Sequence, residues 1–435
     1  MGAMSIISNK EELLESDAEL RGQALEILEA GYSAIDTEKI LKDKIKLDGE
    51  NFSVDGESFS LKSFNKIIFI GIGKCALDGA KTIEGILGDY LTDGIALDVK
   101  SADEASGLKR VRYFTGTHPY PSEINVSVTG QILEMIRGAT EKDLIITLIS
   151  GGGSSLFCLP NNISVETLIE ITKNLTQKGA NIFELNTVRK HLSGVQGGQL
   201  TELCYPAKVI SLIFSDVLGD DISMIASGPT VIDKTTVAEA TQILSKYDLL
   251  NFYLPSGKEL KETPKDPKYF EKVKNILVVS NKNALEAMKT RAEDFGFETS
   301  VESQIISGYA NQVGKEMVSK KAKTKSCLLF GGETTVKISG NGVGGRNQEM
   351  ALAALSQVQP NSILVCAASD GWDNTDHAGA IADTELFQKA KKLGVSPKEY
   401  LENSDSYNFF KKVGGAIYTG KLGSNVSDLY IMLYK

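Results

Sequence analysis

The chain has 435 residues, of which 42% are hydrophobic, 24% are charged and only 10 are proline. This composition is typical of a compact globular protein, and the length predicts two domains, each large enough to bury its own core. Because 47 basic and 56 acidic side chains give a net charge of −9, we expect small-molecule partners and no binding to nucleic acid or to an anionic membrane surface.

The first half of the chain alternates helices with continuous apolar strands. Apolar positions at helical spacing predict an amphipathic helix from residue 11 to about residue 35. Strands are predicted at 66–70, 143–149 and 209–214, and helices at 75–87, 124–137 and 164–177. Continuous apolar runs are typical of strands that are buried on both faces of a parallel sheet. The alternation therefore predicts a doubly wound, mostly parallel α/β sheet.

A domain boundary is predicted in the stretch 251–272, which concentrates prolines and charged residues. Beyond it, strands are expected at 275–280, 326–330 and 363–368, interleaved with helices at 283–295 and 346–355. These elements predict a second α/β domain. We expect the two domains to span residues 5–250 and 273–435.

The first candidate site is a glycine turn after the strand at 66–70. Ligands of parallel α/β sheets bind beyond the carboxyl ends of strands. Gly73 allows close approach of the backbone to a ligand, and the ammonium of Lys74 can neutralise a phosphate or a carboxylate. The spacing matches neither a Walker A loop nor the dinucleotide fingerprint. An ordinary tight turn with an exposed lysine is therefore the alternative.

The second candidate is the run 150–155, which follows the strand at 143–149. Its members are Ser150, Gly151, Gly152, Gly153, Ser154 and Ser155. Three successive glycines cost conformational entropy, which is explained if several backbone N–H groups wrap one anion, with serine hydroxyls as further donors. A flexible turn is the alternative. Nearby, the adjacent Arg189 and Lys190 could hold a polyphosphate or form a surface charge pair.

Carboxylates and one arginine complete the candidate residues. Asp216 lies at the end of the strand 209–214, where Mg²⁺ carrying a nucleotide would find a hard oxygen ligand. Arg346 is delivered to a helix start by a glycine cluster, a position that disfavours a cation unless it meets an anion. A solvated arginine is the alternative there. After the strand 363–368, one of the carboxylates Asp370, Asp373 and Asp376 could be a metal ligand or a general base, and a polar turn is the alternative.

Taken together, these motifs resemble the glycerate 2-kinase family that carries the C-terminal MOFRL domain. The matching stretches, in the family's order, are 73–74, 117–119, 150–155, 186–193, 215–230, 331–335, 344–349, 369–376 and 405–407. The resemblance implies a Rossmann-like N-terminal domain, a MOFRL-type α/β C-terminal domain and an active site in the cleft between them. It also implies ATP-dependent phosphorylation of D-glycerate at the 2-hydroxyl, giving 2-phosphoglycerate and ADP.

The resemblance assigns roles to individual residues. The family's catalytic lysine falls on Lys74 and its catalytic arginine on Arg346. We expect Asp216 or Asp370 to hold Mg²⁺ or to accept the hydroxyl proton. We expect Arg346, Ser154 and Ser155 to hold the carboxylate of glycerate. The full set of expected substrate contacts is Ser154, Ser155, Arg189 and Asn347, and that of nucleotide contacts is Gly73, Gly151, Gly152, Gly153, Lys190 and Glu333.

Two loops depart from the family's pattern. The family usually reads D-G-x-D-G-P-T-D where this chain has DGWDNTD at 370–376, one residue shorter and without the proline. The usual T-G-P-T-G-T-N-V becomes TGKLGSNV at 419–426. Because the second loop could border the substrate, the acceptor could differ from glycerate.

Two other functions remain open from the sequence. One is a nicotinamide-dependent hydroxypyruvate reductase, and the other is a non-catalytic sugar-acid sensor. The five cysteines are scattered singly, without a metal spacing or a disulfide pattern, so they indicate a reducing compartment. No apolar run approaches the length that spans a bilayer. We expect a cytoplasmic enzyme of carbohydrate metabolism, with a homodimer as one open oligomeric state.

Overall fold

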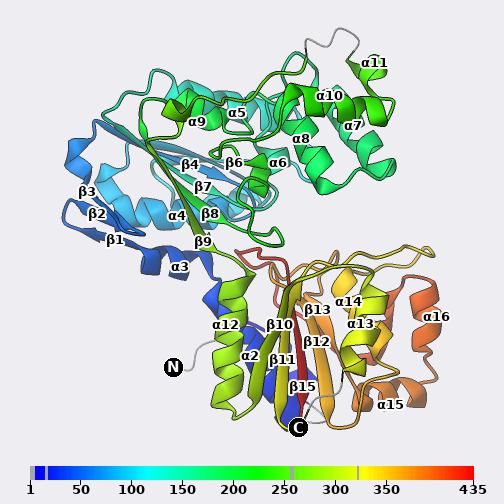
Figure 1. Ribbon diagram of the computed structural model, residues 1–435. Coiled ribbons are helices and arrows are strands. Elements are labelled where there is room, and N and C mark those ends of the chain that lie inside the picture. Colours follow the sequence, from blue (N-terminus) through cyan, green and yellow to red (C-terminus); the bar gives the residue numbers. More distant parts are fainter. Residues whose placement is uncertain (1–4, 15–17, 255–258, 321–322) are drawn as a thin grey trace. The chain divides into compact units, whose positions relative to one another are not determined.

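The computed structural model describes residues 5–14, 18–254, 259–320 and 323–435 (Figure 1). It forms two compact units, which we call the first unit, residues 37–278, and the second unit, residues 279–435 together with the residues up to Asp36. Each unit has its own six-stranded sheet covered by helices. The prediction of a two-part α/β protein is therefore confirmed.

The first unit is built on a sheet with the strand order β6-β5-β4-β7-β8-β9. The strands are β4 (Lys66–Ile72), β5 (Asp93–Asp98), β6 (Val111–Thr115), β7 (Asp143–Ile149), β8 (Lys208–Phe214) and β9 (Val273–Val279). β4 pairs in parallel with β5 and β7, β5 with β6, and β7 with β8. All seven residues of β7 are buried, which explains its continuous apolar sequence.

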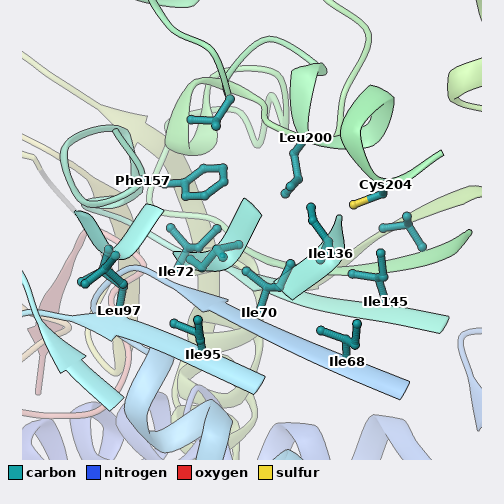
Figure 2. Packing of buried hydrophobic residues seen from close by; sticks show 14 of the residues in the cluster. Ile68, Ile70, Ile72, Ile95, Leu97, Ile136, Ile145, Phe157, Leu200 and Cys204 are labelled. Carbon is teal, nitrogen blue, oxygen red and sulfur yellow. The ribbon is translucent and has the colours of Figure 1, made fainter. Parts of the chain in front are cut away.

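Helices cover both faces of this sheet. The helices of the first unit are α3 (Thr37–Lys44), α4 (Ala76–Leu87), α5 (Glu123–Ile136), α6 (Gly153–Leu156), α7 (Val165–Gln177), α8 (Ile182–Leu192), α9 (Gln199–Cys204), α10 (Val237–Lys246) and α11 (Leu250–Tyr253). Of these, α7, α8, α10 and α11 pack on one another around an apolar cluster of their own. On one face, Ile68 and Ile70 of β4 pack with Ile136 of α5 and Leu200 of α9 (Figure 2). On the other face, α4 approaches closely enough that a Cβ on Gly79 would lie 2.3 Å from Leu148 Cδ1. The predicted doubly wound sheet is confirmed.

A small antiparallel sheet precedes β4. Its strands are β1 (Ile45–Asp48), β2 (Asn51–Val54) and β3 (Glu57–Ser60).

The second unit has a mixed sheet with the strand order β10-β11-β15-β12-β13-β14. The strands are β10 (Glu298–Ile306), β11 (Ser326–Gly332), β12 (Ser362–Ala368), β13 (Gly379–Asp383), β14 (Ala416–Ile417) and β15 (Asp428–Tyr434). β15 lies antiparallel between β11 and β12, so Asp428 is the register partner of Gly332 on one side and of Ala368 on the other. This register brings the carboxyl ends of β11 and β12 and the amino end of β15 to the same end of the sheet.

The helices of the second unit are α1 (Lys10–Leu13), α2 (Ala18–Ala34), α12 (Asn281–Asp294), α13 (Ala310–Ser319), α14 (Arg346–Ala354), α15 (Thr384–Lys392), α16 (Pro397–Glu402) and α17 (Ser406–Val413). α2 packs against α12 and against strands β12 and β15. Leu25 and Leu28 of α2 are fully buried, and the Tyr32 hydroxyl donates a hydrogen bond to the carbonyl oxygen of Ala368 at 3.1 Å. The opening helix is therefore part of the second unit.

The observed division differs from the expected ranges 5–250 and 273–435. The opening helix belongs with the C-terminal residues, and β9, expected in the second domain, is an edge strand of the first sheet. Thr230 and Asn275 tie β9 there, because the Thr230 hydroxyl donates to Asn275 Oδ1 at 2.7 Å. Part of the expected linker, 255–258, lies outside the described residues.

Two expectations from composition can be compared with the described part of the chain. All five cysteines are buried and none forms a disulfide, as expected for small apolar side chains. No helix in the described ranges is both long and apolar enough to cross a membrane.

Candidate active site

The turn that carries Lys74 follows β4 and packs on the loop that follows β7. Gly73 has φ +111°, and a Cβ at this position would lie 2.3 Å from Ser150 Oγ and 2.6 Å from the Ser150 carbonyl oxygen. Lys74 N donates to the Gly151 carbonyl oxygen at 3.0 Å, and Cys75 N donates to Ser150 Oγ at 3.1 Å. Gly73 is therefore required by a close approach of two loops.

The three glycines of the second loop are each crowded by a neighbouring chain segment. A Cβ on Gly151 would lie 2.0 Å from Asp216 Oδ2, and a Cβ on Gly153 would lie 2.5 Å from Ala226 Cβ. At Gly152, which has φ +82°, the nearest atoms are His118 Cδ2 at 3.2 Å and Lys74 Cγ at 3.5 Å. The glycines thus let Lys74, His118 and Asp216 gather around one loop.

Ser154 and Ser155, which follow the glycines, both donate their hydroxyl protons to other groups of the protein. Ser227 Oγ donates to Asn186 Oδ1 at 2.8 Å, so in the 2.9 Å contact between Ser154 Oγ and Ser227 Oγ the donor is Ser154. Ser155 Oγ donates to the Pro119 carbonyl oxygen at 2.8 Å. Both serines therefore offer lone pairs, and not protons, to any further ligand.

Arg189 and Lys190, expected either to hold a polyphosphate or to form a surface charge pair, have different surroundings on α8. Arg189 lines a pocket with Tyr120, Ser154 and Ser155. Lys190 points into the core, where Lys190 Nζ lies 3.1 Å from Asp233 Oδ1 and both side chains are almost fully buried. Burial alone would raise the pKa of Asp233, but Lys190 and hydrogen bonds from Thr235 outweigh burial and lower it. This pairing argues against the expected nucleotide contact of Lys190.

His118 lies beside both of the first unit's candidate cations. Desolvation, followed by the charges of Lys74 and Arg189, lowers the pKa of His118 to about 4. The imidazole is consequently neutral at pH 7 and adds no third positive charge to this cluster.

In the second unit, Arg346 is held by two carboxylates. Arg346 Nε and Nη2 donate to the two Asp428 oxygens at 2.6 and 3.0 Å, and Nη1 lies 2.8 Å from Glu333 Oε1. Asp428 is fully buried and also accepts a hydrogen bond from Tyr430 Oη at 3.2 Å. Burial disfavours the charged arginine, but Asp428 and Glu333 raise its pKa further above the ordinary value. The anion that Arg346 requires at its helix start is thus supplied by the protein itself.

Asp373 caps the same helix. Its carboxylate accepts hydrogen bonds from Asn347 N at 3.1 Å and from Gln348 N at 2.9 Å. Burial and the nearby Asp428 raise the pKa of Asp373 to about 6. Asn347, an expected substrate contact, is fully buried with its Nδ2 donating to Asp373 at 3.1 Å, and its Oδ1 has no hydrogen-bond partner in the described part of the chain.

Two further carboxylates border this cluster. Glu349 is 4% exposed, and burial followed by the charge of Asp373 raises its pKa to about 7. Asp370 follows β12 and accepts a hydrogen bond from Trp372 N at 3.0 Å through Oδ1. Because Ala368 is the register partner of Asp428, Asp370 lies at the same end of the sheet.

The candidate metal ligands lie in different units, Asp216 in the first and Asp370 in the second. Among the described residues, no group of three or more histidine, cysteine or acidic side chains is arranged to hold a metal ion. Mg²⁺ nevertheless needs only one or two carboxylates when phosphate oxygens and waters complete its coordination. Asp216, in contact with the glycine loop, fits that limited requirement.

Sequence reasoning missed Asp428, Asp373 and Glu349 as members of the Arg346 cluster. Asp373 was one of the carboxylates at 370–376 considered as a metal ligand or general base, but its capping of a helix was not predicted. Glu349 lay inside a family motif without an assigned role, and Asp428 lay in a strand that was not predicted. A signal for Asp428 was present, because DLYIMLY at 428–434 is a continuous apolar run that begins with a lone carboxylate.

Two family models match the chain. Residues 23–262 match a domain of unknown function, DUF4147, and residues 326–428 match the MOFRL family.

Known proteins are similar over almost the whole length. D-glycerate 2-kinase of Thermotoga maritima is 35% identical over 430 residues, which cover 95% of this chain and 98% of that protein. Glycerate 2-kinase of Pyrococcus horikoshii is 35% identical over 444 residues, with 97% of each chain covered. The crystal structure of glycerate kinase from Thermotoga maritima superposes with a TM-score of 0.85 at 34% identity, covering 96% of this chain and 100% of that one.

Proposed function

The chain belongs to the glycerate 2-kinase family, and from this premise we propose that it transfers the γ-phosphoryl group of ATP to the 2-hydroxyl of D-glycerate. The products are 2-phosphoglycerate and ADP. The predicted resemblance rested on motifs spread over the chain, and the relatives match across at least 95% of it. The enzyme is a phosphotransferase with an alcohol acceptor.

The reaction makes one bond and breaks one. The 2-hydroxyl oxygen of glycerate bonds to the γ-phosphorus, and the bond from that phosphorus to the β,γ-bridging oxygen breaks, so that ADP leaves with the electron pair. The hydroxyl proton passes to a base, for which Asp216 and Asp370 are the candidates. Such transfers depend mainly on positioning and on stabilising charge at the moving group.

We assign Lys74 to the transferred phosphoryl group. The supporting observation is the convergence of Lys74, the glycine loop and Asp216 at the carboxyl ends of β4, β7 and β8. An ammonium and the N–H groups of a glycine loop are what a phosphate needs, and a carboxylate next to them suits a divalent ion. Mg²⁺ would then be bound by Asp216, with Asp370 as the second candidate, and it would neutralise phosphate charge.

Arg346 is assigned as the second catalytic cation. Asp428 and Glu333 use three of its five N–H groups, which leaves two for a substrate. Glu333 and Asn347 remain candidate contacts beside it, for the nucleotide and the acceptor respectively.

A coupled assay with ATP and D-glycerate tests the function, and phosphorus NMR of the product identifies the acceptor hydroxyl. We expect 2-phosphoglycerate from the wild-type enzyme. Lys74→Ala should lower kcat by at least 100-fold, because charge stabilisation of this kind contributes about 3 kcal/mol or more. Lys142→Ala, at an exposed position of the same unit, is the control. Near wild-type turnover of the Lys74 variant would remove its assigned role.

The reductase considered from the sequence is tested in the same preparation. Oxidation of NADH with hydroxypyruvate, in the absence of phosphoryl transfer to glycerate, would favour that activity over the kinase. Binding of glycerate without any product would favour a sensor.

A further inference from the structure

Arg189 is a cation without a counter-ion among the residues that the structure describes. The side chain lies in the last turn of α8 and is partly buried. Across the described residues, its guanidinium makes no hydrogen bond and no ion pair. Desolvation lowers its pKa, and the groups that act against this are the Cys158 thiol and the Tyr120 phenol, not a carboxylate. A charge that is removed from water and has no partner destabilises the folded state. An anion that binds from solution would therefore stabilise Arg189 by supplying the missing partner.

Arg189 is one of the residues that line a narrow pocket. Its walls include Tyr120, Ser154, Ser155 and Cys158. The space open to the centre of a water molecule is about 20 Å³, which suits one small group and not a chain of phosphates. Because His118 is neutral at pH 7, Arg189 faces a ligand here without a second cation from that side chain.

The two candidate arginines differ in how much charge is left for a ligand. Arg346 is already neutralised by the buried Asp428 and by Glu333, with Asp373 close by. An isolated carboxylate arriving there would meet more negative than positive charge. Within the described ranges no carboxylate neighbours Arg189 in this way, so a monoanion is attracted to it more strongly.

The serines beside Arg189 complement hydroxyl groups. Ser154 donates to Ser227, and Ser155 donates to the Pro119 carbonyl oxygen. Their remaining lone pairs can accept hydrogen bonds from the hydroxyls of a hydroxy acid. Because their protons are already donated, the two serines are poor donors to a carboxylate. This argues against the expectation that they hold the carboxylate of glycerate.

We propose that Arg189 binds the carboxylate of the acceptor, with Ser154 and Ser155 accepting hydrogen bonds from its hydroxyl groups, and that Arg346 does not bind this carboxylate. This assignment rests on the proposed kinase function, since it takes glycerate as the acceptor. It makes Arg189 the residue that selects acids over neutral polyols.

Arg189→Met tests the assignment, because methionine fills similar space without a charge. We expect the KM for D-glycerate to rise about 100-fold, as for the loss of a charge-assisted hydrogen-bonded pair, while the KM for ATP changes less than twofold. Arg189→Lys should recover part of the affinity, since it keeps the charge but not the planar fork. Glycerol, which lacks the carboxylate, should bind wild type and Arg189→Met equally weakly.

Calorimetry with D-glycerate alone separates this proposal from the function. If wild type binds glycerate and makes no 2-phosphoglycerate, the kinase function fails while the carboxylate site is still measurable. If wild type is an active kinase and Arg189→Met keeps its KM for glycerate within twofold, the carboxylate assignment fails alone. A raised KM for ATP with unchanged glycerate binding would assign the pocket to phosphate and overturn the proposal.

Two controls guard against a merely structural effect. Arg137→Met removes an arginine from the exposed end of α5 in the same unit, where the side chain is 75% exposed, and should change neither KM. The melting temperature of Arg189→Met should equal or exceed that of wild type, because an unpaired, partly buried charge has been removed. A large drop in melting temperature together with lost binding of both substrates would indicate a structural role and overturn the assignment.

Discussion

Arg346 and Asp428 form an ion pair in which the carboxylate has no exposure to solvent. The two side chains are far apart in sequence and meet because β15 lies between β11 and β12. Two parallel N–H···O bonds fix the plane of the guanidinium, so Asp428 orients the remaining N–H groups. We regard Asp428 as a positioning residue for Arg346.

Replacing Asp428 by Asn should therefore impair both stability and turnover. Loss of one partner of a buried ion pair leaves the other uncompensated, which costs about 3–5 kcal/mol. Urea denaturation measures this cost, and the coupled assay measures the loss of kcat.

The double variant Asp428→Leu with Arg346→Met separates the two effects. Removing both charges should restore the free energy of unfolding to within about 1 kcal/mol of wild type, while activity stays lost. A wild-type unfolding free energy in Asp428→Asn would contradict the proposed energetic role of the pair.

At the scale of elements, the start of α14 gathers carboxylates around one cation. Asp373 caps the helix from the loop after β12, and Glu349 lies one turn into the helix. For Glu349, the pKa of the folded state, about 7, lies above the ordinary value of 4.5. Stability from the neutral carboxyl is therefore fully present below pH 4.5 and is lost as the pH rises through 7.

Glu349→Gln should make the stability of the second unit less dependent on pH. The shift corresponds to roughly 3 kcal/mol at most, so the variant should gain up to that amount over wild type between pH 5 and pH 8. Urea denaturation across this range measures the gain. Glu316→Gln, at an exposed position of α13, should follow the wild-type profile. A parallel profile for Glu349→Gln would show that the carboxyl is not protonated in the fold.

The two loops that depart from the family's pattern pack against each other. Leu422 N donates to the Asp370 carbonyl oxygen at 2.8 Å, and Lys421 Nζ lies 4.9 Å from the centre of the Trp372 ring. A Cβ on Gly371 would lie 2.1 Å from the Gly420 carbonyl oxygen. Because the loops pack on each other, a change of length in one alters the contacts available to the other.

At the scale of the whole molecule, the chain enters the second unit twice. α2 comes from the N-terminal end, and everything from α12 onward comes from the C-terminal part. Burial of Leu25 and Leu28 of α2 is worth about 2 kcal/mol for each side chain. The first unit, in contrast, is one continuous stretch.

Residues 37–279 expressed alone should thus unfold cooperatively, whereas residues 279–435 alone should not. Joining residue 435 through a Gly/Ser linker to residues 5–36 should restore cooperative unfolding of the second unit. Lys435 Nζ lies 2.7 Å from Glu19 Oε2 at the start of α2, whereas the Ser5 hydroxyl donates to Glu29 further along the same helix. The linker must therefore span the part of α2 between these residues, about 15 Å. Urea titration followed by circular dichroism distinguishes the fragments. Cooperative unfolding of 279–435 by itself would contradict the role of α2.

Much of the first unit could be predicted from the sequence, because strands buried on both faces admit almost only apolar residues. This holds for β4, β7 and β8, and the polar residues that end them, including Lys74 and Asp216, lie close together as expected of neighbouring parallel strands. Gly73 and Gly151 were also identifiable, since their sites leave no room for a Cβ.

Only the tertiary structure decided which charges are satisfied. Whether an arginine has a partner depends on which strands become neighbours, and that is a property of packing between distant segments and not of local sequence. Arg346 and Arg189 both lie in motifs that match the family, yet the first is held by Asp428 from an unpredicted strand and the second lines a pocket. The same reason explains Lys190, whose buried partner Asp233 no local pattern indicated.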